Sequence, residues 1–95
     1  MYVKIKVLGP PLLVELIGKE NIVECPKGSI KDLVDTLIGR YGSAAGHVIL
    51  DKNGNLDRSI QVVINDRDYV KAQDFEKALL KDGDSVTFMM LIAGG

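Results

Sequence analysis

Residues 29–42 of the chain read SIKDLVDTLIGRYG and hold the most regular pattern in the sequence. Ser29 is the expected N-cap of a helix, with Asp32 three residues later in a shortened capping-box arrangement. Apolar residues then recur at intervals of three and four, the spacing of one helix face: Ile30, Leu33, Val34, Leu37, Ile38 and Tyr41. The pattern predicts a helix of about three turns that ends near residues 40–42 and buries this stripe.

Strands are predicted on both sides of this helix. Five segments show the alternation or the short apolar run of a strand and end in Gly, Pro or polar residues: 3–7, 21–25, 59–65, 69–70 and 85–92. Helical spacing before Gly18 predicts a short helical turn over residues 12–17, and another is expected at 75–79. Small residues at 43–46 predict a loop, and the Asn53-Gly54 dipeptide predicts a small hairpin over residues 48–56.

This order of elements favours one α+β domain over residues 1–95. One main helix can cover one face of a mixed sheet of four to five strands. The expected closure places the last strand parallel to the first, through a right-handed crossover. That arrangement is the β-grasp, or ubiquitin-like, fold.

Composition excludes several classes of function. Twelve Lys and Arg against thirteen Asp and Glu give a net charge of −1, so no nucleic acid is expected as a partner. With one Cys and one His, a disulfide, a metal cluster or a Cys–His pair is not expected. The absence of a leader pattern or of a long apolar run predicts a cytoplasmic protein and no membrane contact. A built-in active site is therefore not expected, and Cys25 and His47 are interpreted as structural.

The C-terminal residues suggest a chemical role. The chain ends Leu91-Ile92-Ala93-Gly94-Gly95, and two terminal glycines arise by chance with a probability of roughly half a percent. Backbone without Cβ atoms can thread a narrow channel, and three extended residues reach about 10 Å. We therefore expect a flexible Gly-Gly tail, mobile from about Ala93, that enters a partner's pocket.

The C-terminal segment resembles that of the ubiquitin-like sulfur carriers. The resemblance lies in DGDSVTF at residues 82–88, which leads into Ile92–Gly95, and extends to ELIG at 15–18, VVIN at 62–65 and NDRDYV at 65–70. Related families are the small subunit of molybdopterin synthase and the sulfur carriers of the thiamine and cysteine pathways. The last of these segments is closest to the cysteine-pathway carriers.

The resemblance implies a cycle in which the protein is a co-substrate without catalytic residues. A ubiquitin-activating-type enzyme uses ATP to adenylate Gly95, with Ala93 and Gly94 threading its channel. A persulfide then converts the adenylate into a thiocarboxylate, and a synthase subunit accepts the sulfur. No cofactor is bound by the carrier itself. Molybdopterin biosynthesis is the first expected destination, with the thiamine and cysteine pathways open. A ubiquitin-like modifier joined to lysines through Gly95, or a plain β-grasp binding module, is the alternative.

The last strand also predicts where partners dock. Period two places Val86, Phe88, Met90 and Ile92 on the core side, and Thr87, Met89 and Leu91 on the outer side. Thr87 is expected to be solvated, whereas Met89 and Leu91 form an apolar end to the outer row. Met is adaptable at surfaces that bind more than one partner. Met89 and Leu91 are therefore the predicted partner-docking residues.

Overall fold

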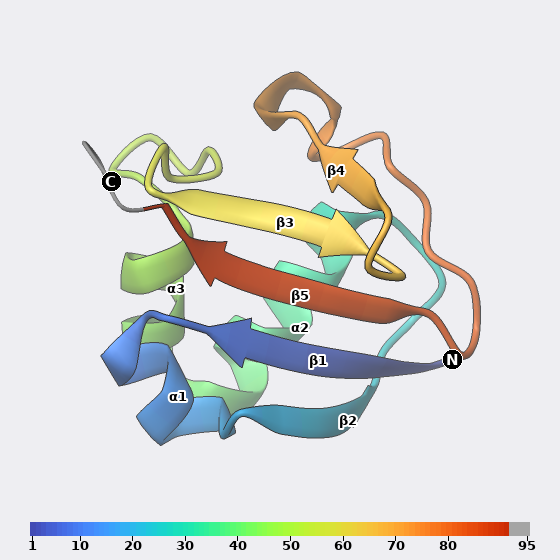
Figure 1. Ribbon diagram of the computed structural model, residues 1–95, viewed down its shortest axis with the longest axis horizontal. Helices are drawn as coiled ribbons and strands as arrows, with labels where there is room; N and C mark the ends of the chain where they lie inside the picture. The colour runs from blue at the N-terminus through green and yellow to red at the C-terminus, as the bar shows by residue number, and fades with distance from the viewer. Residues whose placement is uncertain (92–95) are drawn as a thin grey trace.

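The computed structural model describes residues 1–91 (Figure 1). The predictions about Ile92, Ala93, Gly94 and Gly95 lie outside the described residues.

A five-stranded mixed sheet forms one layer of the domain, with helices packed on its inner face (Figure 1). The strands lie in the order β2-β1-β5-β3-β4 and span Tyr2–Leu8 (β1), Glu20–Glu24 (β2), Ile60–Ile64 (β3), Asp68–Val70 (β4) and Ser85–Met90 (β5). β5 is parallel to β1 and antiparallel to β3, while β1–β2 and β3–β4 are antiparallel pairs. The predicted β-grasp arrangement is confirmed, with the last strand at the centre of the sheet.

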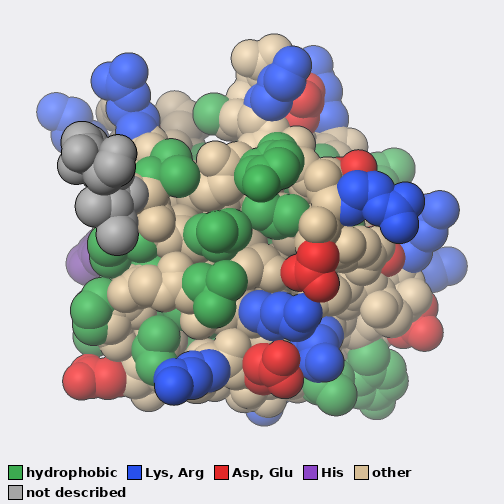
Figure 2. All heavy atoms as spheres, viewed as in Figure 1, with side chains coloured by type: hydrophobic (Ala, Val, Ile, Leu, Met, Phe, Trp, Pro, Cys, Tyr) green, Lys and Arg blue, Asp and Glu red, His purple; other side chains and the backbone are tan. Residues whose placement is uncertain are grey.

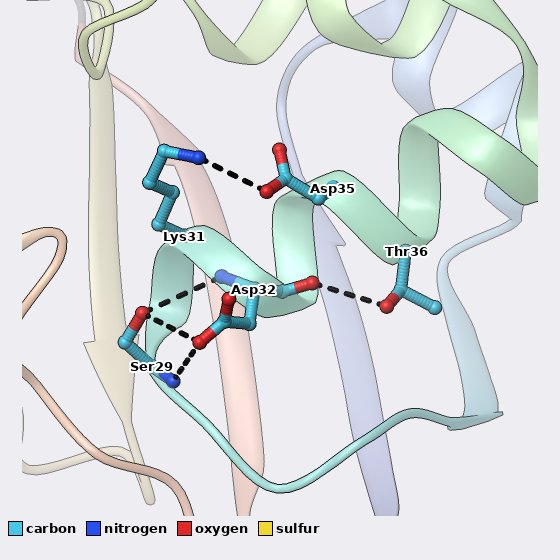
Figure 3. Close-up of polar contacts among 5 residues, drawn as sticks. All are labelled: Ser29, Lys31, Asp32, Asp35 and Thr36. Carbon is cyan, nitrogen blue, oxygen red and sulfur yellow. Dashed lines mark hydrogen bonds and ion pairs between the residues drawn. The ribbon is translucent and has the colours of Figure 1, made fainter.

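The main helix is α2, Ile30–Tyr41, and it begins as the sequence predicts. The Ser29 backbone N–H donates to Asp32 Oδ2 at 2.8 Å, and Ser29 Oγ accepts from the Asp32 backbone N–H at 3.4 Å (Figure 3). The apolar stripe faces the sheet, with Ile38 and Tyr41 at its partly buried edge. Gly42, at φ +92°, ends the helix because few other residues adopt this conformation.

The loop predicted at residues 43–46 is wrong, because α3 spans Ser43–Ile49. Small residues serve close packing here: Ala45 is fully buried, and a Cβ on Gly46 would lie 3.0 Å from Ile38 Cδ1 on α2. The hairpin predicted over residues 48–56 is reduced to one isolated bridge between Leu50 and Leu56. The small residues that favour a loop in the sequence instead allow α2 and α3 to pack closely against each other.

Two short helical segments complete the fold. The turn predicted before Gly18 is α1, Pro11–Ile17, which buries Leu13 and Ile17. The helical turn predicted at residues 75–79 begins earlier, as a 3₁₀ turn over Ala72–Asp74. No helix among residues 1–91 is long and apolar enough to span a membrane.

Candidate docking face and exit of the C-terminal segment

β5 leads to the C-terminus from the middle of the sheet. It lies between β1 and β3, with Met89 in register with Leu8 on one side and with Gln61 on the other. Met90 is in register with Ile60, and the Leu91 backbone N–H donates to the Ser59 carbonyl at 2.7 Å. The described chain therefore stays attached to the sheet up to Leu91, and residues 92–95 follow directly from that point.

Apolar side chains are exposed around this exit. Leu8 is 55% exposed, Met90 39% and Leu91 49%, while Met89 is half-buried between its neighbours. Met90 is on the core side of β5, as Phe88 is, so we call the other three residues, Leu8, Met89 and Leu91, the apolar exit patch. Figure 2 shows hydrophobic side chains gathered on the half of the sheet face where β1 and β5 end. Exposed apolar surface grouped in this way is typical of an interaction site, in contrast to scattered single residues.

Charged side chains border the other half of the same face. Lys6 Nζ lies 3.3 Å from Asp66 Oδ2, and Lys4 Nζ lies 3.9 Å from Glu20 Oε2. Both pairs are solvent-exposed and contribute little to folding stability. Tyr2, Ile22 and Tyr69 are also exposed on this face, so the charged pairs interrupt its apolar surface and do not confine it to the exit.

The predicted solvation of Thr87 is wrong. Thr87 is on the outer side, but it is only 2% exposed, because β5 is central and Lys6 and Val63 lie in register on either side. Met90, predicted to face the core, is partly exposed because it lies at the very end of β5. Alternation therefore predicts the side of a residue correctly, while strand order decides how far its neighbours cover it.

The predicted docking residues Met89 and Leu91 lie at the end of β5 and just after it, and Leu8, which sequence reasoning did not name, lies at the same end of the outer face. Leu8 stands directly beside Met89. The signal for Leu8 was present, because the alternation of Lys4 and Lys6 continues to residue 8 and places it on the outer face.

Other candidate residues lie away from this exit. Asp82 and Asp84 belong to the turn before β5: Asp82 Oδ1 accepts from the Tyr2 N–H at 2.7 Å, and Asp84 Oδ2 from the Lys81 N–H at 2.8 Å. Both carboxylates therefore act as turn residues in the described structure. His47 is exposed on α3. Within residues 1–91, His, Cys, Asp and Glu nowhere form a cluster of three suited to a metal ion.

Cys25 is buried directly after the end of β2. Burial raises the pKa of the Cys25 thiol, with the Asp32 carboxylate adding to the effect and the N-terminal amine opposing it. A buried thiol with a raised pKa is a poor nucleophile at neutral pH. The cysteine is therefore unsuited to accept sulfur.

The five-stranded sheet, with β5 parallel to β1 at its centre, places the protein in the β-grasp, or ubiquitin-like, fold class. The profile of the ThiS family matches residues 11–95. The chain belongs to the ThiS family of ubiquitin-like sulfur carriers, whose members are small carriers and not enzymes. No curated protein sequence shows a significant match to the chain.

Solved structures agree with this class. SAMP1 from Haloferax volcanii superposes with a TM-score of 0.78 over 100% of both chains at 20% identity, which supports the fold alone. SAMP1 from Methanosarcina acetivorans is 27% identical with a TM-score of 0.74, covering 99% of this chain and 96% of its own. A chain of the BexX/CysO complex from Amycolatopsis orientalis is 29% identical with a TM-score of 0.70, covering 98% and 99%.

Proposed function

We propose that this protein is a sulfur carrier that is adenylated at Gly95 and then carries a C-terminal thiocarboxylate. The observation that supports this most is the position of β5. It is the central strand, and it delivers the chain at Leu91 beside the apolar exit patch, with Ile92-Ala93-Gly94-Gly95 still to follow. An enzyme that binds the patch would have the terminal carboxylate within reach of about 13 Å, the extended length of four residues.

The proposed chemistry takes place on the terminal carboxylate. An oxygen of Gly95 attacks the α-phosphorus of ATP bound to an activating enzyme, which forms the acyl adenylate and releases pyrophosphate. The terminal sulfur of a persulfide attacks the acyl carbon, and AMP leaves. A second thiol then attacks the sulfur of the persulfide donor, which becomes a disulfide, and the carrier leaves as the thiocarboxylate. Hydrolysis after sulfur donation restores the carboxylate. We place these steps in the cytoplasm, where ATP and reduced thiols are available.

The role proposed for the chain's own residues is recognition and access. Met89 and Leu91, together with Leu8, would provide an apolar anchor for both the activating enzyme and the sulfur-accepting synthase. Gly94 and Ala93 would pass through the channel that leads to the nucleotide, because they carry little or no side chain. ATP and any cofactor belong to the partner enzymes in this proposal.

The destination of the sulfur is the finer part of the proposal. We propose molybdopterin synthase as the first acceptor to test, supported by the resemblance of the segments 15–18 and 62–65. The cysteine pathway is the next, since the segment 65–70 is closest to carriers of that pathway and a BexX/CysO chain is 29% identical. The resemblance of the Ile92–Gly95 ending to thiamine-pathway carriers keeps thiamine synthesis as a third acceptor.

A second function is favoured by one specific observation. Three of the similar structures are small archaeal modifier proteins, two from Haloferax volcanii and one from Methanosarcina acetivorans, which is 27% identical. A modifier would use the same adenylate and then form an amide bond between Gly95 and a lysine amine, with loss of AMP. The two functions therefore share the activation step and differ in the nucleophile.

Intact mass spectrometry of the protein purified from its native host distinguishes these functions. A carrier is expected to show the mass increase of one oxygen-to-sulfur exchange, located by fragmentation in the C-terminal peptide. Conjugates of higher mass that contain a Gly95–lysine linkage would support the modifier. If cells that contain an activating enzyme yield neither the thiocarboxylate nor a conjugate, both proposed functions are contradicted. A matched sample that lacks Gly95 shows which signals require the terminal residue.

A further inference from the structure

The turn after β1 lies directly against the point where the chain leaves the sheet. Gly9 has φ +114° and follows Leu8, the last residue of β1. A Cβ on Gly9 would lie 2.9 Å from Met90 Cβ and 3.4 Å from Met90 N. No side chain fits at Gly9 without movement of Met90, because real Cβ atoms are essentially never found so close to another heavy atom. The bare backbone of residue 9 therefore forms one wall beside the end of β5.

The opposite wall is formed by the turn before β3. Leu91 N–H donates to the Ser59 carbonyl at 2.7 Å. Ser59 is itself held by Asp57, whose Oδ1 accepts from Ser59 N at 2.9 Å and from Ser59 Oγ at 2.6 Å. The Ile60 N–H also donates to the Asp57 carbonyl at 3.0 Å. The carbonyl that holds Leu91 thus belongs to a turn with several internal hydrogen bonds.

We propose that Gly9 and Asp57 are positioning residues that together set the direction of the chain at Met90 and Leu91, the residues that precede the proposed reacting terminus. This inference rests on the proposed adenylation of Gly95. Met90 and Leu91 lie in a slot with Gly9 on the β1 side and Ser59, held by Asp57, on the β3 side. In this proposal the apolar exit patch sets where a partner binds, and the slot sets the direction of the chain at Leu91 on that surface. A small misplacement of a reacting group costs up to about a hundredfold in rate.

A purely structural role for Gly9 makes a different prediction. Its positive φ alone would favour glycine, as at Gly42, where φ is +92° and a Cβ would meet nothing within 4 Å. If Gly9 served only the turn, alanine there would lower stability in the same way as alanine at residue 42. The contact with Met90 is what distinguishes the two positions, so the test compares substitutions at both.

The experiment measures adenylation by the host's activating enzyme, as pyrophosphate release at saturating ATP over a range of carrier concentrations. Gly9→Ala is expected to lower kcat by roughly tenfold to a hundredfold while KM changes less than about twofold, because the patch still binds. Gly42→Ala is expected to lower the melting temperature with kcat unchanged. The double variant Gly9→Ala with Met90→Gly removes the Cβ that alanine would meet, and it is expected to recover most of kcat without recovering stability.

Three results would overturn the inference. These are full kcat in Gly9→Ala, equal kcat losses in Gly9→Ala and Gly42→Ala, and no recovery in the double variant. A wild-type carrier that is not adenylated at all would instead contradict the proposed function, which keeps the two failures distinct.

Two further measurements apply even if Gly9→Ala does not fold. The wild-type protein is expected to show nuclear Overhauser effects between the Gly9 α-protons and Met90, and their absence would overturn the inference. Asp57→Ala frees Ser59 on the other side of the slot and is expected to lower kcat with KM unchanged. Full kcat in that variant would remove Asp57 from the proposal.

Discussion

Asn65 holds Ser85 in a two-sided contact that joins the end of β3 to the start of β5. Asn65 Oδ1 accepts from the Ser85 backbone N–H at 2.9 Å, and the Asn65 backbone N–H donates to the Ser85 carbonyl at 2.7 Å. Asn65 Nδ2 also donates to Asp84 Oδ1 at 3.1 Å. Asn65 has φ +54°, a left-handed conformation that Asn adopts more readily than most residues. One side chain thus orients the strand that leads to the C-terminus.

Asn65→Ala is expected to lower the free energy of unfolding by about 2 kcal/mol. The variant loses two side-chain hydrogen bonds, each contributing about 1 kcal/mol or less at this exposed site, and places alanine in the left-handed region. Asn65→Gly is the matched control, since it loses the same bonds without backbone strain and should be less destabilised. Urea denaturation measures both. An Asn65→Ala variant within about 0.5 kcal/mol of wild type would contradict this account.

The capping box of α2 predicts a dependence of stability on pH. The Ser29 backbone N–H, and then its hydroxyl, donate to the Asp32 carboxylate and lower its pKa below the ordinary value of 3.8. A carboxyl with a lower pKa in the folded state stabilises the fold fully above its unfolded pKa, and this contribution is lost as pH falls through the folded pKa. The stability difference between wild type and Asp32→Asn should therefore be largest near neutral pH and shrink below pH 3.8.

Urea denaturation at a series of pH values checks this dependence. Asp35→Asn is the control, because Asp35 pairs with the exposed Lys31 at 3.0 Å on the same helix and leaves the capping box intact (Figure 3). A difference between wild type and Asp32→Asn that stays constant from neutral to acid pH would show that the cap does not depend on the ionised carboxylate.

Sequence patterns predicted those elements whose signals are local. The Ser29 cap and the stripe from Ile30 to Tyr41 together define α2, because capping and periodicity act within a few residues. The strands follow from alternation and from their Gly and Pro boundaries. The outer-side position of Met89, beside Leu8, also follows from period two, while the docking role of Met89 and Leu91 stays a prediction.

The features that were missed depend on contacts between distant residues. The sequence predicts a loop where α3 lies, because small residues such as Gly46 are typical of loops. In the structure Gly46 is small because Ile38, on α2, packs against it. Thr87 was expected to be solvated because alternation carries no information about the strands on either side of it. The sequence gives Gly9 only the role of ending the first strand, because the contact that excludes a side chain there is with Met90, eighty-one positions later in the chain.

Replacing Cys25 should leave sulfur transfer intact. The thiol is buried with a raised pKa, so the Cys25→Ala carrier is expected to form the C-terminal thiocarboxylate in the same yield as wild type. Intact mass spectrometry after incubation with the activating enzyme, ATP and a persulfide donor measures this yield. Alkylation by iodoacetamide should be slow in the native protein and fast in urea. Loss of the thiocarboxylate in a Cys25→Ala variant with a normal melting curve would give the cysteine a chemical role.

Changes at the terminal glycines should abolish activation without affecting the fold. Deletion of Gly95 shortens the chain, so that its terminal carboxylate lies one residue too early to reach the nucleotide. Gly94→Val adds a branched side chain where a narrow channel is expected. Both residues follow Met90, the last residue of β5, so the melting temperature should not change. Pyrophosphate release by the activating enzyme measures the loss. Gly39→Ala, at an open position of α2, is the control that should keep full activity. An active Gly94→Val carrier would contradict the threading role.

Met89 and Phe88 are adjacent in β5, but substitution of Met89 is expected to weaken partner binding, whereas substitution of Phe88 is expected to destabilise the fold. Phe88 is fully buried, so Phe88→Ala should lower the free energy of unfolding by about 3–5 kcal/mol. Met89 is half-buried beside the exposed Leu8, so Met89→Asp should cost about 1 kcal/mol of stability and weaken binding to the activating enzyme by more than about 1 kcal/mol. Urea denaturation and titration calorimetry measure the two quantities.

Leu79→Asp provides the matched control for Met89→Asp. Leu79 is exposed and apolar, but it bridges to Ser29 at the start of α2 and not to the exit patch. The same substitution there should leave binding unchanged, because aspartate then falls outside the docking face. Equal binding losses in the two variants would place the docking face elsewhere. A Met89→Asp protein that unfolds while Phe88→Ala stays folded would mean that the two faces of β5 are assigned the wrong way round.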